Sequence, residues 1–345
     1  MSEAMTRAER WAWIAGAVGI VGGVVGWIVV PRDFAYAWLA AFVAFSPWPL
    51  GSTALLLAHS LTGGRWGEAA RPALLLGAAA TPLIAVLAVP VVLMLPTLYP
   101  WARAGAGFDN GWYLSVSFFA VRGVIYLAVW IGVALAAVAG GERAARIAPA
   151  GLLALAVTTT FAAIDATMSL EPEFTSSIYG MIAMTGAGLL AMAVACALSA
   201  AGASAKDRND LGKLLLALTL LWTYLDFMQL LIVWQSDLVT QAPWYLKRRA
   251  GFWGGVMAAV AIGHSLVPIL LLLWPQVRKK AVALAGVAVL LVAMTVVRAW
   301  WTVVPEEPRL PGVVDLACLL GVGGVGAGFA LWRSRRVAVG EIRHA

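Results

Sequence analysis

The sequence is poor in the residues that hold metal centres. Its 345 residues include two cysteines, Cys196 and Cys318, and three histidines. There is no CxxC pair and no cysteine cluster, so iron–sulfur ligation and a structural zinc site are excluded.

The three histidines are also poorly placed for haem. A membrane b-type haem needs two histidines at matching depth on facing helices. His59 is expected near the cytoplasmic end of one apolar stretch, His264 near the middle of another, and His344 in the C-terminal tail. Because these depths differ, we expect no haem and therefore no redox cofactor in this chain.

Charge is scarce as well, and long apolar runs take its place. Charged residues make up 12% of the chain and hydrophobic residues 62%, with a mean hydropathy of +0.88. No connection between the apolar stretches exceeds 16 residues, which leaves no room for a soluble catalytic domain. A run of about 20 such residues spans roughly 30 Å of hydrocarbon. The sequence predicts an all-α polytopic membrane protein, a single membrane domain over residues 1–345. The ten expected spans are 11–30, 36–60, 72–96, 113–139, 149–169, 178–200, 211–235, 252–274, 281–303 and 312–332.

The basic residues predict the orientation, because Lys and Arg in short loops remain in the cytoplasm. The side of the N-terminus carries 15 of them outside the spans, and the opposite side carries six. Both termini are therefore expected in the cytoplasm. The net charge of +7 fits this topology and contact with anionic lipids, and it gives no support to nucleic-acid binding.

Ionisable side chains within the spans are the main candidates for function, since each costs at least about 2.5 kcal/mol at membrane depth. Arg122 and Asp226 both lie about 14 Å from the expected periplasmic ends of their helices, at 1.5 Å per residue. They are therefore the predicted ion pair. The buried-charge or proton-path candidates are Arg122, Asp165, Asp226, His264, Arg298 and Asp315.

Polar residues line one face beside two of these acids. Thr158, Asp165 and Ser169 share one helical face, and Thr219, Thr223, Asp226 and Gln229 share another. Such stripes can hold a file of water that carries protons, continued by His264 and opening near Glu171 and Glu173. The alternative is that Thr and Ser hold helices together while each Asp is locked in a structural ion pair. The sequence leaves both interpretations open.

Proline and glycine predict where helices bend and where they approach closely. Pro47, Pro49, Pro82 and Pro90 should kink their spans, with the PWP segment at 47–49 as the principal break. The GVGGVGAG run at 321–328 is interpreted as small-residue helix packing, because no strand precedes it as a nucleotide-binding glycine pattern would require.

Several blocks of sequence resemble one family of membrane subunits. The segment LTGGRWGEAARP at 61–72 is similar to the stretch after the second helix in the ActF subunits of bacterial alternative complex III, a quinol-oxidising respiratory assembly. The further blocks, in the same order, are LYPWA at 98–102, FFAVRGVIYLAVW at 118–130, FAAIDATMSLEPEFTSSIYG at 161–180, DLGKLLLA at 210–217, and WTYLDFMQLLIVWQSDL at 222–238 followed by PWYLKR at 243–248.

This resemblance implies a fold, a set of partners and a compartment. ActF is similar to the NrfD-like polysulfide-reductase membrane subunits, with ten helices and two four-helix bundles inside. It implies a subunit of the bacterial inner membrane that holds no redox cofactor. The implied partners are an ActC-like membrane subunit and periplasmic multihaem cytochrome and iron–sulfur subunits, with assembly and proton movement as its roles.

The chain departs from the family in three places. Thr240 and Gln241 stand where relatives usually have a pair of glutamates, Met228 replaces a serine before Gln229, and Ala166 replaces a tryptophan. These changes put a proton route through that loop in doubt and affect the assembly role less.

Two other functions stay open from sequence. In the first, this chain itself binds quinol as its substrate, with His59 or Asp165 accepting the proton. In the second, it is a stand-alone ion-coupled secondary transporter, since a ten-helix bundle with broken helices and buried charges suits that class too.

Overall fold

The computed structural model describes residues 3–105, 107–108, 110–236 and 239–344, and within these ranges the side chains from 6 to 333. The described part of the chain is helical and contains no strand. Some residues used above for topology or resemblance lie outside the described residues or side chains: Asp237, Leu238, Arg335, Arg336, Arg343 and His344.

The elements follow one another with short connections. Those of the first half are α1 Glu3–Val29, α2 Pro31–Phe45, α3 Pro47–Thr62, α4 Arg65–Ala79, α5 Leu83–Leu93, α6 Leu95–Leu98, the 3-10 turn η1 Pro100–Ala102, α7 Val116–Ala139, α8 Gly141–Ala166 and the 3-10 turn η2 Met168–Leu170. Those of the second half are α9 Tyr179–Ser199, α10 Ala205–Gln235, α11 Ala242–Arg249, α12 Gly251–Val260, the π-helix η3 Ala261–Leu266, α13 Val267–Leu273, α14 Pro275–Lys279, α15 Ala281–Val303, the 3-10 turn η4 Val304–Glu306 and α16 Val313–His344.

The architecture is that of a multi-pass membrane protein. Among the described residues, nine helices are long and apolar enough to cross a bilayer, and the number rises to ten if the bent α4–α5 pair is one span. These helices coincide with the ten predicted stretches, apart from shifts of several residues at their ends.

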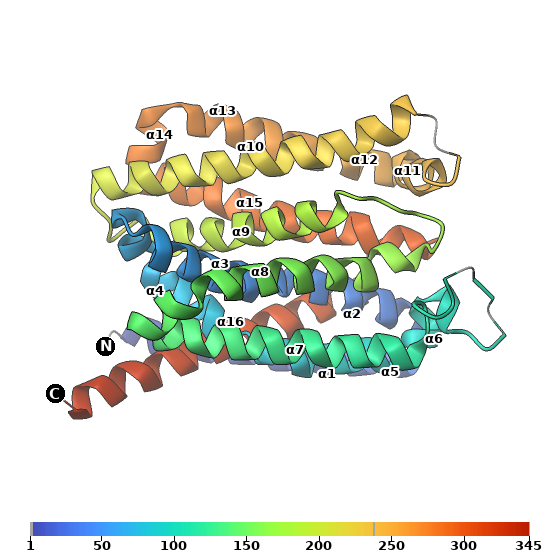
Figure 1. Cartoon of the computed structure of the whole chain (residues 1–345), viewed down its shortest axis with the longest axis horizontal. Helices are drawn as coiled ribbons and strands as arrows, with labels where there is room; N and C mark the ends of the chain where they lie inside the picture. The colour runs from blue at the N-terminus through green and yellow to red at the C-terminus, as the bar shows by residue number, and fades with distance from the viewer. Residues whose placement is uncertain (1–2, 106, 109, 237–238, 345) are drawn as a thin grey trace.

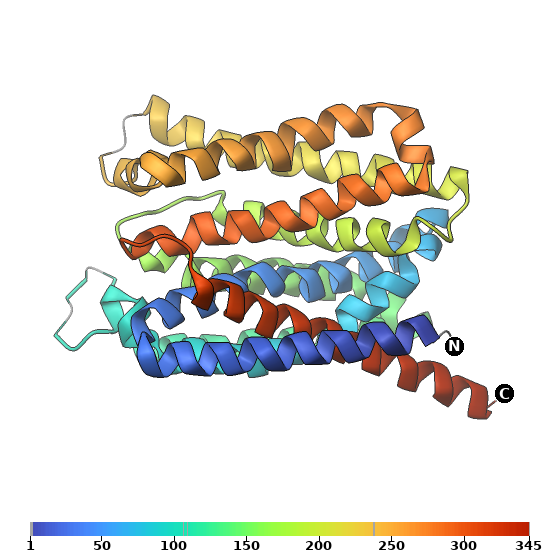
Figure 2. The same ribbon diagram turned by 180° about the vertical axis from the view of Figure 1, so that it is seen from behind.

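The long helices run side by side, and both termini lie at the same end of the molecule (Figure 1). The opposite end, which carries α6 and α11, is called the distal end below (Figures 1 and 2). Two termini at the same end of the molecule require an even number of membrane crossings. The ten predicted spans meet this condition. Which end faces the cytoplasm stays a prediction.

The largest bend in a span lies at a different proline from the one that the sequence predicts. The expected principal break, at PWP, interrupts the helix only at Ser46, whose φ of −57° and ψ of −30° are still helical. Residues 31–62 therefore form one apolar span. The larger bend, 42°, separates α4 from α5 at Pro82. The prediction that PWP is the principal break was wrong, because proline is tolerated in the first turn of a helix, where Pro47 and Pro49 lie.

Glycines bring the first and last spans into close contact, as the glycine run predicts. A Cβ atom on Gly19 of α1 would lie 2.1 Å from the backbone nitrogen of Gly321 in α16, and one on Gly324 would lie 2.4 Å from that of Gly16. Helix backbones approach this closely only where side chains are absent. The α1–α16 pair packs beside α2.

The other spans pack in two neighbouring groups. In the first, α3 contacts α4, α7 and α8; in the second, α9 contacts α10 and α15, and α15 contacts α12 and α13. Helices α3 and α9 join the groups. Glycine also permits this junction, because a Cβ on Gly51 would meet the carbonyl oxygen of Ala187.

A π-helix interrupts the α12–α13 span at His264. Pro268 has no N–H to donate to the carbonyl of His264, and its ring crowds that carbonyl, so the preceding turn widens. Gly263 allows the widened turn to approach α15, where a Cβ would lie 2.7 Å from the sulfur of Met294.

Candidate functional site

Three carboxylates within the spans each meet an arginine in the half of the molecule nearer the distal end. Their partners differ from the predicted ones. Arg122 pairs with Asp165 and Arg298 pairs with Asp226, so the predicted pair of Arg122 with Asp226 is wrong. Equal depth was not sufficient, because α7, which carries Arg122, packs on α8, whereas α10, which carries Asp226, packs on α9 and α15.

The Arg122–Asp165 pair is bidentate and buried. Nε and Nη2 of Arg122 each donate to one carboxylate oxygen of Asp165 at 2.9 Å. The Tyr126 hydroxyl donates to the same carboxylate at 2.9 Å. The guanidinium lies 3.8 Å from the ring centroid of Tyr113 and donates to its carbonyl oxygen. Burial, together with the nearby Asp165 carboxylate, raises the pKa of Tyr113 to about 12. Both carboxylate oxygens of Asp165 thus already accept hydrogen bonds from Arg122 or Tyr126.

The Asp226–Arg298 pair is less enclosed. Nη2 of Arg298 donates to Oδ1 of Asp226 at 2.5 Å, and the side chains are 17% and 24% exposed respectively. The Arg298 guanidinium lies 4.4 Å from the ring centroid of Trp301. This contact helps to fix the arginine, because a cation is attracted to an aromatic face.

The third carboxylate, Asp315, is held by a residue expected outside the membrane. Arg309 donates to both Asp315 oxygens, at 2.6 and 3.0 Å, and the backbone N–H of Gly312 donates at 2.8 Å. The six-residue separation of Arg309 and Asp315 is the sequence signal that could have identified this pair.

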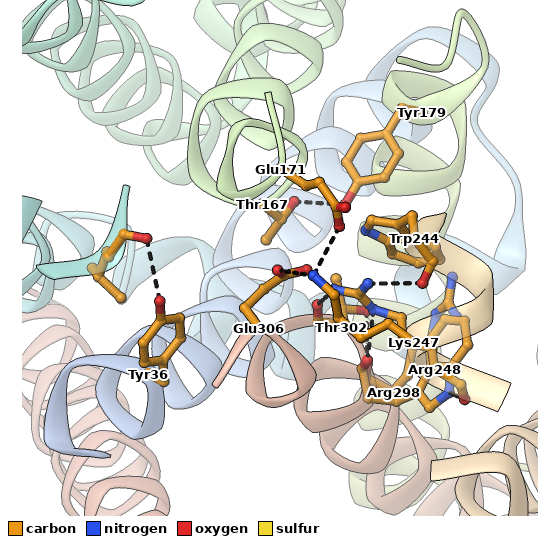
Figure 3. Close-up of polar contacts among 12 residues, drawn as sticks. Tyr36, Thr167, Glu171, Tyr179, Trp244, Lys247, Arg248, Arg298, Thr302 and Glu306 are labelled. Carbon is orange, nitrogen blue, oxygen red and sulfur yellow. Dashed lines mark hydrogen bonds and ion pairs between the residues drawn. The ribbon is translucent and has the colours of Figure 1, made fainter. Parts of the chain in front are cut away.

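A fourth cluster of charges, at the distal ends of α11 and α15, was missed from sequence (Figure 3). Arg248 is fully buried, forms an ion pair with Glu306 and lies 3.8 Å from the ring centroid of Trp244. Lys247 bridges Glu306 at 2.8 Å and Glu171 at 3.2 Å. Burial lowers the pKa of Arg248, and the carboxylate of Glu306 opposes this shift.

Arg248 was counted among the loop charges because it follows Lys247 in a polar segment. The only sequence signal for its burial is the block PWYLKR, which places two aromatic residues beside it. The cluster also bears on the expected opening of a proton path near Glu171 and Glu173. Glu171 contacts Lys247 and has no contact with Asp165 among the described residues, while Glu173 is exposed.

His264 lies near the middle of its span, as expected, and it borders an internal cavity. Its side chain is 3% exposed, and neither ring nitrogen has a hydrogen-bond partner among the described residues. The ring lies 4.2 Å from that of Trp222. The cavity, called the His264 chamber, has a volume of about 190 Å³ and mainly apolar walls, in which the polar side chains are those of Ser46, Thr159, Thr167, Tyr179, Gln229, His264, Thr295, Arg298 and Thr302.

The size of the His264 chamber favours water over a larger ligand. Ligand pockets usually measure roughly 300–1,000 Å³, whereas a water molecule in liquid occupies about 30 Å³. The chamber therefore has room for several waters, which the two unpartnered nitrogens of His264 could bind.

A second cavity, of about 330 Å³, lies between α10, α11, the α12–α13 span and α15. We call it the Asp226 cavity because Asp226 and Arg298 form its charged wall. Arg298 also borders the His264 chamber, so this one arginine stands between the two spaces.

The polar stripes are mostly bonded to the protein. Thr219 donates to the carbonyl of Leu215 at 2.7 Å, and Ser169 donates to that of Asp165 at 2.6 Å. Thr158 accepts from Trp130 at 3.0 Å. Thr158 thus joins α8 to α7, whereas Thr219 and Ser169 each bond to a carbonyl one turn earlier in the chain. Asp226 and its surrounding cavity retain the features of a hydrated path.

Gln229, together with Thr240 and Gln241, connects the loops of the distal end. Gln229 donates to the hydroxyl of Tyr245 at 3.1 Å and accepts from that of Ser176 at 2.7 Å. Gln241 donates to Thr175 at 3.0 Å and accepts from Thr240 at 2.6 Å. Neutral groups thus connect these loops.

His59 is placed at the opposite end of the molecule, as the sequence predicts. Its Nε2 lies 3.0 Å from the carbonyl oxygen of Gly64, and its ring lies 5.3 Å from that of Trp66. It is therefore remote from the three ion pairs.

Residues from four of the six resembling blocks meet at the distal end. Tyr99 and Trp101 donate to the carbonyls of Ala166 and Ser169, at 2.9 and 3.1 Å. Further contacts between blocks are Arg122 with Asp165, Gln229 with Ser176 and Tyr245, Lys247 with Glu171, and a stack of Phe174 on Trp244 at 4.8 Å. Blocks spread over 150 positions of the sequence thus form one contiguous structure.

Comparison with protein-family models and with curated proteins finds no match to this chain. Among the described residues, no group of three or more His, Cys, Asp or Glu side chains is placed to hold a metal ion. The two cysteines, in α9 and α16, are buried and unpaired.

Proposed function

We propose that this chain is a membrane subunit of a quinol-oxidising respiratory complex of the alternative complex III type. The observation that supports this most is the convergence of four of the six resembling blocks into one network at the distal end. Most of the residues in this network are buried, so it fixes the loops of the distal end in one arrangement, and a docking platform for other subunits requires such fixed loops. The resemblance supplies the partners: an ActC-like membrane subunit, a multihaem cytochrome and an iron–sulfur subunit.

The packing of the spans supports the proposed NrfD-like arrangement of the helices. Two groups of neighbouring helices, with α1 and α16 beside them, agree with an NrfD-like arrangement of two four-helix bundles. In this proposal the distal end faces the periplasm of a bacterial inner membrane, and the redox cofactors belong to the partner subunits.

The second role in the proposal is a proton half-channel from the distal end. The path would run from the Asp226 cavity past Arg298 to the His264 chamber. An ionisable group within a span is usually placed on such a path or in a structural pair. Asp226 is the better relay of the two acids on the stripes, because it accepts one hydrogen bond and lines a cavity, whereas Asp165 accepts three.

Purification in mild detergent tests the proposal. A tag on this chain should recover cytochrome-bearing partners in fixed ratio, with haem absorbance and iron in the eluate. A chain that elutes alone and intact would contradict it. For the proton path, Asp226→Asn in the assembled complex should lower proton uptake, while the exposed-loop variant Glu173→Gln should leave uptake unchanged.

A stand-alone secondary transporter is the second candidate. Its supporting observation is the pair of broken spans, α4–α5 with its 42° bend and α12–α13 with its π-helix at His264. Interrupted helices near buried charges are common at transporter binding sites. A chain that elutes alone and drives ion-dependent uptake in liposomes would establish this function instead.

A further inference from the structure

Four basic side chains gather around α14, at the end of the molecule that carries both termini (Figure 1). We call them the α14 basic cluster: Arg208 in the first turn of α10, Arg278 and Lys279 in α14, and Lys280 directly after it. Among the described residues, no carboxylate forms an ion pair with any of them. The two acids in the first turns of α10 pair with other bases, as Asp207–Arg65 and Asp210–Lys213. This corner of the molecule therefore keeps uncompensated positive charge.

The two arginines of the cluster fix α14 in place, and the two lysines stay free. Nε of Arg208 donates to the carbonyl oxygen of Lys279 at 2.7 Å. Nε of Arg278 donates to Oδ1 of Asn209 at 3.1 Å, and its Nη1 donates to the last two carbonyls of α13. The side chains of Lys279 and Lys280 are exposed, and neither ammonium group has a hydrogen-bond acceptor among the described residues. The lysines are therefore available to a ligand, on a segment that is already held in position.

A groove of about 650 Å³ lies beside the free lysines. It forms where the chain turns from α13 through α14 into α15, and its walls are Trp274, Pro275, Gln276, Val277, Lys280 and Ala283. Most of these walls are apolar, and the side chain of Trp274 is 66% exposed. Helices α13 and α14 lie at one edge of the molecule in both views (Figures 1 and 2). The groove thus opens outward from the bundle.

The groove lies at the level of the lipid head groups. It joins the end of the apolar span 251–273 to the start of the span 281–306. Trp and Lys are the residues that border the hydrocarbon at such positions. The exposed side chains of Leu270 and Leu273 continue the apolar surface from the groove along α13, each about half exposed. A ligand with both a charged head and apolar chains would match the whole surface.

The geometry points to a binding site for one anionic phospholipid at this groove. The head-group phosphate binds the ammonium groups of Lys279 and Lys280, and the acyl chains lie along Trp274 and the exposed leucines of α13. Charge selects the class of lipid, because a zwitterionic head group brings its own cation toward an uncompensated positive cluster. The residues that form the groove lie outside the resembling blocks, and the inference does not depend on the proposed function.

Lipid titration monitored by native mass spectrometry tests the inference. The sample is the tagged protein in mild detergent with whatever subunits accompany it. The probes are dioleoylphosphatidylglycerol, which is anionic, and dioleoylphosphatidylcholine, which has the same chains and no net charge. We expect one site per chain that prefers the anionic lipid by at least about fivefold. Equal affinity for the two lipids would overturn the inference.

Two double variants separate a local site from the general charge of this end of the molecule. Lys279→Gln with Lys280→Gln should weaken binding of the anionic lipid at least about tenfold, because both head-group contacts are lost. Arg143→Gln with Arg146→Gln removes the same charge from exposed positions of α8 at the same end and should keep the affinity within about twofold. Equal losses in the two double variants would refute the site.

A third pair of variants tests the groove itself. Ala283→Trp fills it from the wall, and we expect the anionic lipid to bind at least about fivefold more weakly. Val282→Trp is the matched control, because Val282 is the neighbouring residue, is 88% exposed and does not line the groove. Unchanged binding in Ala283→Trp would overturn the groove as the binding surface. Displacement of the lipid by an equal concentration of glycerol 3-phosphate would assign the lysines to free phosphate and overturn the lipid.

Discussion

Arg248 and Trp301 each donate a hydrogen bond to the backbone carbonyl of the other. Nε of Arg248 lies 3.2 Å from the Trp301 oxygen, and Nε1 of Trp301 lies 3.1 Å from the Arg248 oxygen. Arg248 also donates to the carbonyl of Thr302 at 2.7 Å, so it satisfies two backbone carbonyls in the last turn of α15, which have no partner within the helix. The short helix α11 is fixed to α15 by this exchange.

Replacement of Arg248 should therefore destabilise the distal end. Arg248→Gln leaves Glu306 with Lys247 as its remaining cationic partner and removes the donors from three backbone carbonyls, and a buried acceptor left without a donor costs about 1–3 kcal/mol. We expect a clear fall in the thermal unfolding temperature in detergent. Arg249→Gln, at the exposed neighbouring arginine, should change stability by less than about 0.5 kcal/mol. Equal stability of the two variants would show that Arg248 is not held as described.

A double-mutant cycle tests the partners of the buried arginines. Asp165→Asn should lower stability strongly because it leaves Arg122 uncompensated, and the added change Arg122→Gln should restore part of the loss. Combination of Arg122→Gln with Asp226→Asn should instead be additive within about 0.5 kcal/mol, since these two side chains have separate partners. Strong coupling in the second cycle would favour the pairing by depth.

His264 should tolerate an apolar replacement. Neither ring nitrogen bonds to a described protein group, so His264→Phe removes no protein hydrogen bond and keeps the ring against Trp222. We expect thermal stability to change by less than about 1 kcal/mol, because only bound water is displaced. A loss above about 2 kcal/mol would reveal a hydrogen-bond partner for the imidazole.

The glycine contact between the first and last spans gives a sharper steric test. Gly19→Ala places a methyl group 2.1 Å from the backbone of Gly321 and should force α1 away from α16. Gly323→Ala is the control, because nothing lies within 4 Å of its Cβ and alanine favours a helix over glycine. Unfolding temperatures should fall for the first variant and stay equal or rise for the second.

The position of the termini predicts a topology result. Both lie at one end of the molecule, and the basic bias of 15 to six predicts that this end faces the cytoplasm. Cytoplasmic reporters fused to either terminus should be active, and a reporter in the 103–113 loop should report the periplasm. Opposite results for the two termini would mean an odd number of spans.

The sequence by itself determined the helical membrane architecture, because length and hydropathy alone decide which segments can cross about 30 Å of hydrocarbon. It also determined which side chains carry charge within the spans and where glycine permits close contact. Depth along a helix is readable from residue number at 1.5 Å per residue.

Only the tertiary structure decided which charges meet. Pairing depends on which helices are neighbours and how each is rotated, and these are set by packing between segments far apart in sequence. Arg122 therefore joined Asp165 rather than Asp226, and Arg248 became buried although its neighbours in sequence are polar. The same packing left one oxygen of Asp226 beside an open cavity, which no residue pattern along the chain could predict.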